Sequence, residues 1–177
     1  MPTLFSHPAV PLALGLGLGR QPIPRRLLWA GVCASILPDL DVLAFRFGIP
    51  YASELGHRGF SHSLLFAFLV ALLGLALARC FNAQRLWTFG FLLVSTASHG
   101  VLDAFTNGGM GIAFFWPWST ARHFAPVQVI EVSPLSVSRF FSSRGLMVLY
   151  SELLWVWLPC ILLGLILAHR RRFRGKN

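Results

Sequence analysis

LLWAGVCASILPDLDVLAFRF, residues 27–47, is the stretch that decides the fold class. A helix that crosses a bilayer needs about 20 predominantly apolar residues, and this run reaches that length with only Asp39, Asp41 and Arg46 charged. Three more runs are similarly long and apolar, namely residues 60–78, 86–105 and 146–168. The sequence therefore predicts an all-helical fold with four long apolar helices.

The composition indicates an integral membrane protein. Hydrophobic residues make up 55% of the 177 residues and charged residues only 12%, and the mean hydropathy is +0.66, which is too apolar for an ordinary soluble domain. A fifth stretch, residues 8–19, is shorter and rich in glycine; we expect a short span there, with a re-entrant segment or a surface helix as alternatives. No basic residue precedes Arg20, so we expect no cleaved secretory signal. We predict one domain over residues 1–177, a polytopic bundle of about five helices.

Membrane topology accounts for most of the net charge of +9. Ten basic residues fall on one predicted side: Arg20, Arg25, Arg26, Arg79, Arg85, Arg170, Arg171, Arg172, Arg174 and Lys176. Five fall on the other: Arg46, Arg58, Arg122, Arg139 and Arg144. The positive-inside rule orients the first side, and with it the C-terminus, toward the cytoplasm. The basic tail then touches anionic lipid headgroups, and no motif indicates binding to nucleic acid.

Candidate metal ligands concentrate on the outward side. All six carboxylates fall on or toward it, together with every histidine except His169. Ionisable side chains near a bilayer cost free energy and are usually functional, so we interpret this group as a metal-centred active site. Its candidate ligands are His7, Asp39, Asp41, His57, His62, His99 and Asp103. His7 belongs to it only if the first short stretch spans.

Two short motifs carry part of this chemistry. His99 and Asp103 are four residues apart near the outer end of a predicted helix, which places both side chains on one face, about 6 Å apart. Alone, that pair fits a chelated metal and a hydrogen-bonded pair equally well. In Pro38-Asp39-Leu40-Asp41, both aspartates can face one centre only if the backbone leaves regular helix, which Pro38 makes plausible. Otherwise one aspartate binds the metal and the other orients a histidine.

His57-Arg58-Gly59-Phe60-Ser61-His62-Ser63 opens the next apolar run. We expect Ser61 to cap the helix and Gly59 to allow a sharp turn, so that both histidines approach one centre. The charge of Arg58 and the helix N-terminus favour a phosphoryl oxygen. The remaining connection, residues 106–145, is long and aromatic, with Trp116-Pro117-Trp118 at its centre. Tryptophan prefers headgroup depth, so we expect a cap at the membrane interface.

These motifs and their order resemble the YdjM-like family, described as LexA-regulated, inner-membrane, metal-dependent hydrolases. The chain is more distantly similar to the zinc-dependent phospholipase C and single-strand nuclease superfamily, whose His-x-x-x-Asp helix matches His99 and Asp103. That superfamily's His-x-x-x-Glu motif and N-terminal Trp ligand have no counterpart here. The resemblance thus implies one or two ions in place of three, with zinc the usual occupant and manganese or iron possible.

The resemblance also implies roles for individual residues. A bound divalent metal would activate water and polarise a phosphoryl oxygen. Asp39 or Asp41 would act as the base, with Asp41 the predicted catalytic residue, and Arg58 would stabilise charge on the phosphate. Arg122 and His123 in the aromatic loop are candidate headgroup contacts.

An outward interfacial site favours a lipid-like phosphorylated substrate, such as a phospholipid or a polyprenyl phosphate. Two other classes stay open: a metal or proton transporter, and a structural metal-binding assembly factor. A transporter needs polar residues that continue toward the cytoplasm, where the runs are chiefly Leu, Ala, Gly and Val. Structural zinc sites often use cysteine, which is absent from this group.

Overall fold

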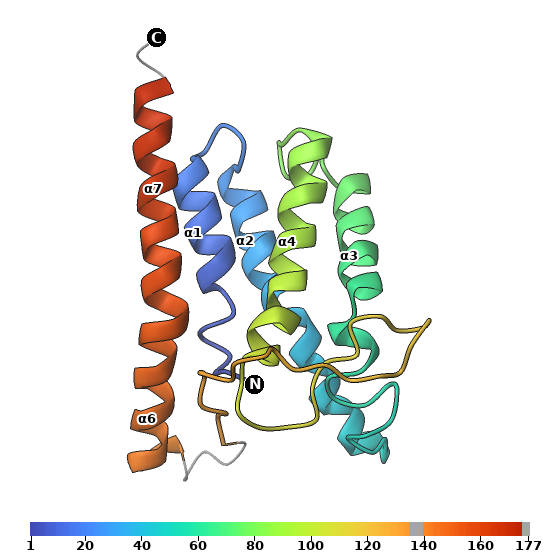
Figure 1. Cartoon of the computed structure of the whole chain (residues 1–177). Coiled ribbons are helices and arrows are strands. Elements are labelled where there is room, and N and C mark those ends of the chain that lie inside the picture. The colour runs from blue at the N-terminus through green and yellow to red at the C-terminus, as the bar shows by residue number, and fades with distance from the viewer. Residues whose placement is uncertain (135–139, 175–177) are drawn as a thin grey trace.

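The computed structural model describes residues 1–134 and 140–174, and this part of the chain is all-helical apart from two isolated β-bridges. Five helices follow the predicted apolar runs (Figure 1). The elements are α1 (Ala9–Leu18), α2 (Arg25–Ile36), η1 (Leu37–Phe47), η2 (Phe60–His62), α3 (Leu64–Ala76), α4 (Arg85–Ala104), α6 (Ser143–Glu152), η3 (Leu153–Trp157) and α7 (Leu158–Arg174). The last three follow one another without a break and act as one long helix.

Two helical segments among the described residues are long and apolar enough to cross a membrane. They are Arg25–Phe47, formed by α2 and η1, and Ser143–Phe173, formed by α6, η3 and α7. Helices α1 and α3 are equally apolar but shorter. At about 1.5 Å per residue, the 10 residues of α1 reach only about half of a hydrocarbon core of about 30 Å. The length of α1 therefore does not by itself establish the short span predicted for residues 8–19.

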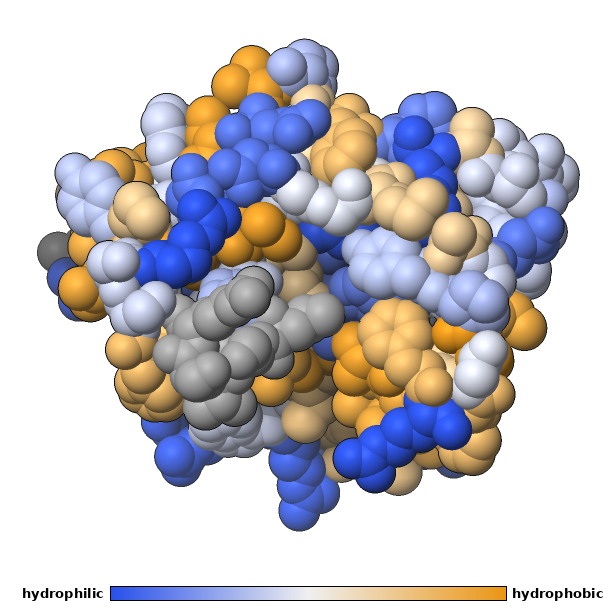
Figure 2. All heavy atoms as spheres, turned by 90° about the horizontal axis from the view of Figure 1, so that it is seen from below, coloured by the Kyte–Doolittle hydropathy of each residue, from blue (hydrophilic) through white to orange (hydrophobic). Residues whose placement is uncertain are grey.

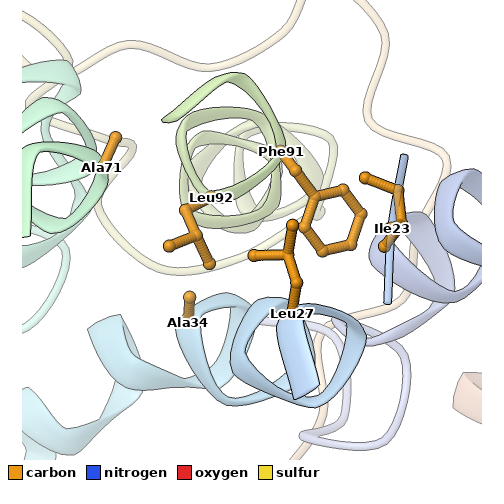
Figure 3. Close-up of a cluster of buried hydrophobic side chains, with 6 residues drawn as sticks. All are labelled: Ile23, Leu27, Ala34, Ala71, Phe91 and Leu92. Carbon is orange, nitrogen blue, oxygen red and sulfur yellow. The ribbon is translucent and has the colours of Figure 1, made fainter. Parts of the chain in front are cut away.

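Helix α4 lies at the centre of the bundle, between α2 and α3, and α1 packs against α2 and α7 (Figure 1). A cluster of buried apolar side chains joins α2, α3 and α4 (Figure 3). Its members are Ile23, Leu27, Ala34, Ala71, Phe91 and Leu92. Glycine allows α1 and α7 to approach closely, because a Cβ on Gly17 would lie 2.9 Å from the Gly164 carbonyl oxygen.

Local chemistry ends α2 and begins α3. Pro38 follows the last turn of α2, and the chain continues as the 3-10 segment η1, which confirms the predicted departure from regular helix. The cap of α3 differs from the prediction: Ser63, not Ser61, accepts the hydrogen bond from the Phe66 amide, at 3.1 Å. Ser61 instead donates to Asp41, because the 3-10 turn η2 starts the helix two residues later.

Residues 105–134 cross the end of the bundle at which the N-terminus lies (Figure 1). Backbone hydrogen bonds tie this loop to itself and to the helices, for example from Asn107 N to Ile130 O and from Leu64 N to Phe114 O, both 3.0 Å. Ile112 and Ile130 of this loop are buried. Phe115 and Trp118 are 53% and 80% exposed, so the loop has an apolar underside and an apolar outer surface.

Basic residues without acidic neighbours gather at one end of the bundle, and the carboxylates gather at the other. The α1–α2 and α3–α4 connections and the end of α7, which hold the arginines of the predicted inner side, lie at one end (Figure 1). The predicted metal ligands lie at the other end, seen in Figure 2, where hydrophilic and hydrophobic residues are mixed. Arg139 and Lys176 fall outside the described residues, as does the side chain of Arg174.

Candidate metal centre

Four buried side chains from three elements meet at one point, and we call them the inner cluster: Asp39, His62, His99 and Asp103. Helix α4 supplies His99 and Asp103, which lie one turn apart as predicted. Asp39 comes from η1, just after Pro38, and His62 ends η2. None of the four is more than 4% exposed.

The ligand atoms of the inner cluster face one another at 3.0 to 3.8 Å. His99 Nε2 lies 3.0 Å from His62 Nε2 and 3.3 Å from Asp39 Oδ1. His62 Nε2 lies 3.8 Å from Asp39 Oδ1 and 3.6 Å from Asp103 Oδ2. Both oxygens of Asp39 and both of Asp103 are buried without a hydrogen-bond partner among the described residues. Buried polar atoms are rarely left so.

The tautomers of the two histidines sharpen this point. His99 Nδ1 lies 2.7 Å from the Ser35 carbonyl oxygen, which can only accept, so Nδ1 carries the proton. His62 Nδ1 lies 3.2 Å from the Asp41 carboxylate, which assigns its proton in the same way. If both rings are neutral, two Nε2 lone pairs then face each other at 3.0 Å. Either a shared proton or a metal ion between them removes this repulsion, and a metal ion also serves the carboxylate oxygens that have no hydrogen-bond partner among the described residues.

The donor set fits a divalent metal. Zinc binds histidine nitrogen and carboxylate oxygen at about 2.0–2.2 Å, so two tetrahedral ligands lie about 3.3 Å apart. The distances above, from 3.0 to 3.8 Å, bracket that separation. A carbonyl or carboxylate partner on the second ring nitrogen is the usual way in which a metal-binding histidine is oriented. Asp39, His62, His99 and Asp103 could therefore hold one ion.

His7 lies on the far side of the two carboxylates. Its Nε2 is 3.7 Å from Asp39 Oδ2 and 3.8 Å from Asp103 Oδ1, the oxygens that face away from His62. Its ring stacks on His99 with centroids 3.7 Å apart, and burial lowers the pKa of His7 to about 3, so the imidazole is neutral. With both carboxylates shared, His7 could complete a place for a second ion.

A buried carboxylate fixes the segment that carries His7. Glu152, in α6, accepts hydrogen bonds from the Thr3 amide, from Thr3 Oγ1 at 2.7 Å and from Ser6 Oγ at 2.7 Å. Trp157 Nε1 donates to Ser6 Oγ at 3.2 Å. The sequence prediction assigned Glu152 no role, although it is the only acidic residue in the run 146–168. That isolation was the signal that could have found it.

Asp41 and His57, which we call the outer pair, are spaced differently. His57 Nδ1 lies 2.6 Å from Asp41 Oδ1, which is a hydrogen-bond length, and together with His62 the pair forms a second group that could hold a metal ion. Asp41 Oδ2 accepts from Ser61 Oγ at 2.6 Å and from the Arg58 amide at 3.2 Å. His57 Nε2 has no hydrogen-bond partner among the described residues and is not fully buried. The outer pair is therefore linked by hydrogen bonds, and one imidazole nitrogen stays free.

Arg58 points into the protein. It is fully buried, and all three guanidinium nitrogens contact protein groups: Nε lies 3.1 Å from Asp103 Oδ2, Nη1 donates to Gly108 O at 2.7 Å, and Nη2 donates to Thr106 Oγ1 at 2.9 Å. Its backbone is left-handed, with φ 65°. Next to it, a Cβ at Gly59 would overlap the Glu54 carbonyl oxygen, so this tight turn requires the glycine. The geometry fits a residue that holds Asp103 better than one that contacts a phosphate.

Arg122 and His123 lie away from the inner cluster. Arg122 is partly exposed and donates to three loop carbonyls, those of His57, Ala52 and Ser53, so it braces the loop that carries His57. His123 is exposed and its ring packs edge-on against Phe115. Sequence reasoning missed the Ser35 carbonyl and Thr106 as supports, because main-chain acceptors and single hydroxyls leave no recognisable pattern.

Fold and site together define a class: an all-helical protein with long apolar helices and a buried Asp/His group that could hold a metal ion. The family model described as YdjM inner membrane protein matches residues 1–176, and the chain belongs to that family. It is 52% identical over 173 residues to a protein of Escherichia coli (strain K12) described as inner membrane protein YbcI, an alignment that covers 97% of this chain and 100% of that protein. No solved structure matches the chain significantly. The predicted family resemblance is confirmed.

Proposed function

We propose that this inner membrane protein is a metal-dependent hydrolase that cleaves a phosphate ester in a lipid-like substrate at the outer face of the membrane. The observation that carries the proposal is the inner cluster, in which four buried carboxylate oxygens have no hydrogen-bond partner among the described residues and two imidazole nitrogens face each other at 3.0 Å. Aspartate-rich sites without cysteine are more typical of open, hydrolytic metal centres than of closed structural ones. We further propose that the bundle is polytopic, with the C-terminus in the cytoplasm.

The residues divide into three tasks. Asp39, His62, His99 and Asp103 would hold the ion, with His7 beside a second one. A divalent metal in such a site supplies an activated water and a polarised phosphoryl oxygen. Arg58 keeps the Asp103 carboxylate in place, and Asp41 orients His62. A rigid arrangement of this kind is what a preorganised site requires.

We assign the proton transfer to His57 in preference to Asp41. Both oxygens of Asp41 are engaged by His57, Ser61, His62 and the Arg58 amide, whereas His57 Nε2 is free. As water attacks, the new O–P bond forms, one water proton moves to His57 Nε2, and the bond from phosphorus to the leaving oxygen breaks. His57 then returns the proton to that oxygen. A histidine oriented by a carboxylate is the commonest general acid and base.

The surroundings of the site support an amphiphilic substrate. Phe115 and Trp118 are exposed on the loop that crosses this end of the bundle, and tryptophan is typical of the headgroup region. A substrate that diffuses in the membrane would meet this surface from the side. We therefore propose a phospholipid or polyprenyl phosphate, with Arg122 and His123 as contacts at the rim of the loop.

The test is hydrolysis by detergent-purified protein loaded with zinc or manganese, measured on a panel of phosphate esters and other lipid esters. We expect turnover of at least one lipid phosphate, lost in His99→Ala and retained in a His169→Ala control, whose histidine is exposed near the end of α7. A metal-loaded protein that hydrolyses nothing, and binds the panel no better than His99→Ala does, would contradict the proposal.

A transporter remains the second candidate because one observation favours it. Thr88, Ser95 and Thr96 are buried on α4 along the line that leads from His99 toward the opposite end. Their hydroxyls, however, donate to carbonyls of their own helix turn, and the apolar cluster of Figure 3 lies at the same level. Metal uptake into proteoliposomes distinguishes the two candidates: transport without hydrolysis would replace our proposal.

A further inference from the structure

The opposite end of the bundle has a groove of about 690 Å³ between α1, α2 and α7, where no sequence motif directs attention. Arg20, Arg25 and Arg171 line it together with apolar side chains, among them Leu12, Leu16 and Leu28. Trp29 stands at its edge and is 61% exposed. A cationic, partly apolar hollow of this kind is independent of the metal centre.

The three arginines have no acidic partner. All six carboxylates of the chain lie at the other end of the bundle. Two belong to the inner cluster, one belongs to the outer pair, and the other three are those of Glu54, Glu131 and Glu152. No described residue forms an ion pair with Arg20, Arg25 or Arg171. The groove therefore presents uncompensated positive charge, which an anionic ligand would neutralise.

Arg171 is held in the groove wall by a specific contact. Its Nη1 donates to the Leu16 carbonyl at 3.2 Å, one of the carbonyls that end α1. A side chain at Gly19, where φ is 91°, would overlap the Arg171 guanidinium. Glycine at that position thus lets the arginine lie against the end of α1, where the helix dipole favours a cation.

An apolar path continues from the groove. Leu12 and Leu16 also line a second hollow of about 320 Å³ between α1 and α7, whose other walls include Ala13, Ile161 and Leu165. The arginines are thus followed by an apolar channel along the same pair of helices. A cationic groove followed by an apolar hollow matches the shape of a phospholipid, with its phosphate at the arginines and an acyl chain along α1 and α7.

We propose that this groove binds an anionic phospholipid from the leaflet that the basic end faces. Basic pockets between membrane helices are suited to such headgroups, and each arginine near anionic lipid contributes about a fivefold gain in affinity. Trp29 at the rim is placed as interfacial tryptophans usually are. Inorganic phosphate would occupy only the arginines and gain nothing from Leu12 and Leu16.

Native mass spectrometry of the detergent-purified protein tests the proposal, with phosphatidylglycerol and phosphatidylcholine of identical acyl chains and with glycerol phosphate as the soluble headgroup. We expect phosphatidylglycerol to be retained selectively. Arg20→Gln should weaken its binding roughly fivefold, and the double change Arg20→Gln with Arg171→Gln roughly 25-fold. Arg20 donates no hydrogen bond to a described residue, so its single variant tests the charge without loosening α1 from α7.

Arg79→Gln is the matched control, since Arg79 is exposed at the same end and its substitution removes the same charge. Its binding of phosphatidylglycerol should stay at the wild-type level. Equal retention of both lipids would overturn the proposal. An equal loss of phosphatidylglycerol binding in Arg79→Gln and Arg20→Gln would also overturn it, because it would indicate a diffuse effect of charge. Displacement of the lipid by glycerol phosphate at equimolar concentration would also overturn it, because the acyl chain would then contribute nothing.

Discussion

The inner cluster and the outer pair use the same residue types at different spacings. In the inner cluster, histidine and aspartate atoms face one another at 3.0 to 3.8 Å and the carboxylates have no hydrogen-bond partner. In the outer pair, histidine and aspartate meet at 2.6 Å. The first spacing matches two ligands of one ion and the second matches a hydrogen bond, although Asp41, His57 and His62 also lie close enough together to hold an ion. Under the proposed function, distance thus separates the candidate metal ligands from the residues that would orient them and move protons.

Removing an inner carboxylate should have the largest effect. Asp103→Asn preserves the volume of the side chain but removes a charged ligand, and we expect the bound zinc or manganese of the purified protein to be lost. Elemental mass spectrometry of the wild type, Asp103→Asn and the His169→Ala control measures this directly. Metal retained at wild-type stoichiometry in Asp103→Asn would show that the inner cluster is not the site.

His57→Gln separates metal binding from catalysis. We expect the metal content to stay unchanged, since His57 Nδ1 is hydrogen-bonded to Asp41, while turnover of the phosphate ester falls about 10²–10⁴-fold, as is usual when a general acid or base is lost. The comparison requires parallel measurement of hydrolysis and metal content. If the metal is lost together with the activity, His57 is a metal ligand, and the two spacings do not distinguish ligands from catalytic residues.

Asp41→Asn tests orientation of a ligand. The carboxylate faces His62 Nδ1 at 3.2 Å, and loss of such a support typically lowers metal affinity about 10–100-fold. Competition with a chelator of known affinity gives the value. An affinity that equals that of the wild type would mean that Asp41 does not set the orientation of His62.

Ser61→Ala and Ser63→Ala form the finest comparison, because the two serines are two residues apart. Ser63 caps α3, so Ser63→Ala should lower the free energy of unfolding by about 1 kcal/mol and leave metal affinity unchanged. Ser61 donates to Asp41 at 2.6 Å, so Ser61→Ala should weaken metal binding instead. Thermal unfolding and chelator competition should be measured on both variants. A loss of stability in Ser61→Ala, or a loss of metal affinity in Ser63→Ala, would contradict the assignment.

Much of this arrangement could be predicted from the sequence. The apolar runs became helices, and the departure from helix after Pro38 is confirmed. The spacing of His99 and Asp103 placed them on one face of α4, and the family resemblance is confirmed. These features are local: they depend on hydrophobic run length, helical period and the missing amide of proline, which a single segment carries without its neighbours.

Other features could not be predicted because they depend on distances between segments. The sequence left open whether Asp39 and Asp41 face one centre together or divide the roles of ligand and support, and only the structure shows that Asp39 faces the inner cluster while Asp41 accepts hydrogen bonds. Arg58 was expected to contact a phosphate, and its left-handed backbone turns it instead toward Asp103 and Thr106. A tight turn of this kind is set by the packing of the loop against its neighbours, which the spacing of residues does not encode.

The sequence by itself determined the class of the molecule, the helical runs, the separation of charges between the two ends and the set of candidate ligands, because burial of apolar surface and the cost of charge near a bilayer act on each segment separately. The tertiary structure decided which of those ligands meet at one point with carboxylates that lack a hydrogen-bond partner among the described residues, which residues support them, and that Glu152 anchors the segment carrying His7. The assignment of a role to each polar atom depends on differences of about 1 Å between segments far apart in the chain, and only packing sets those distances.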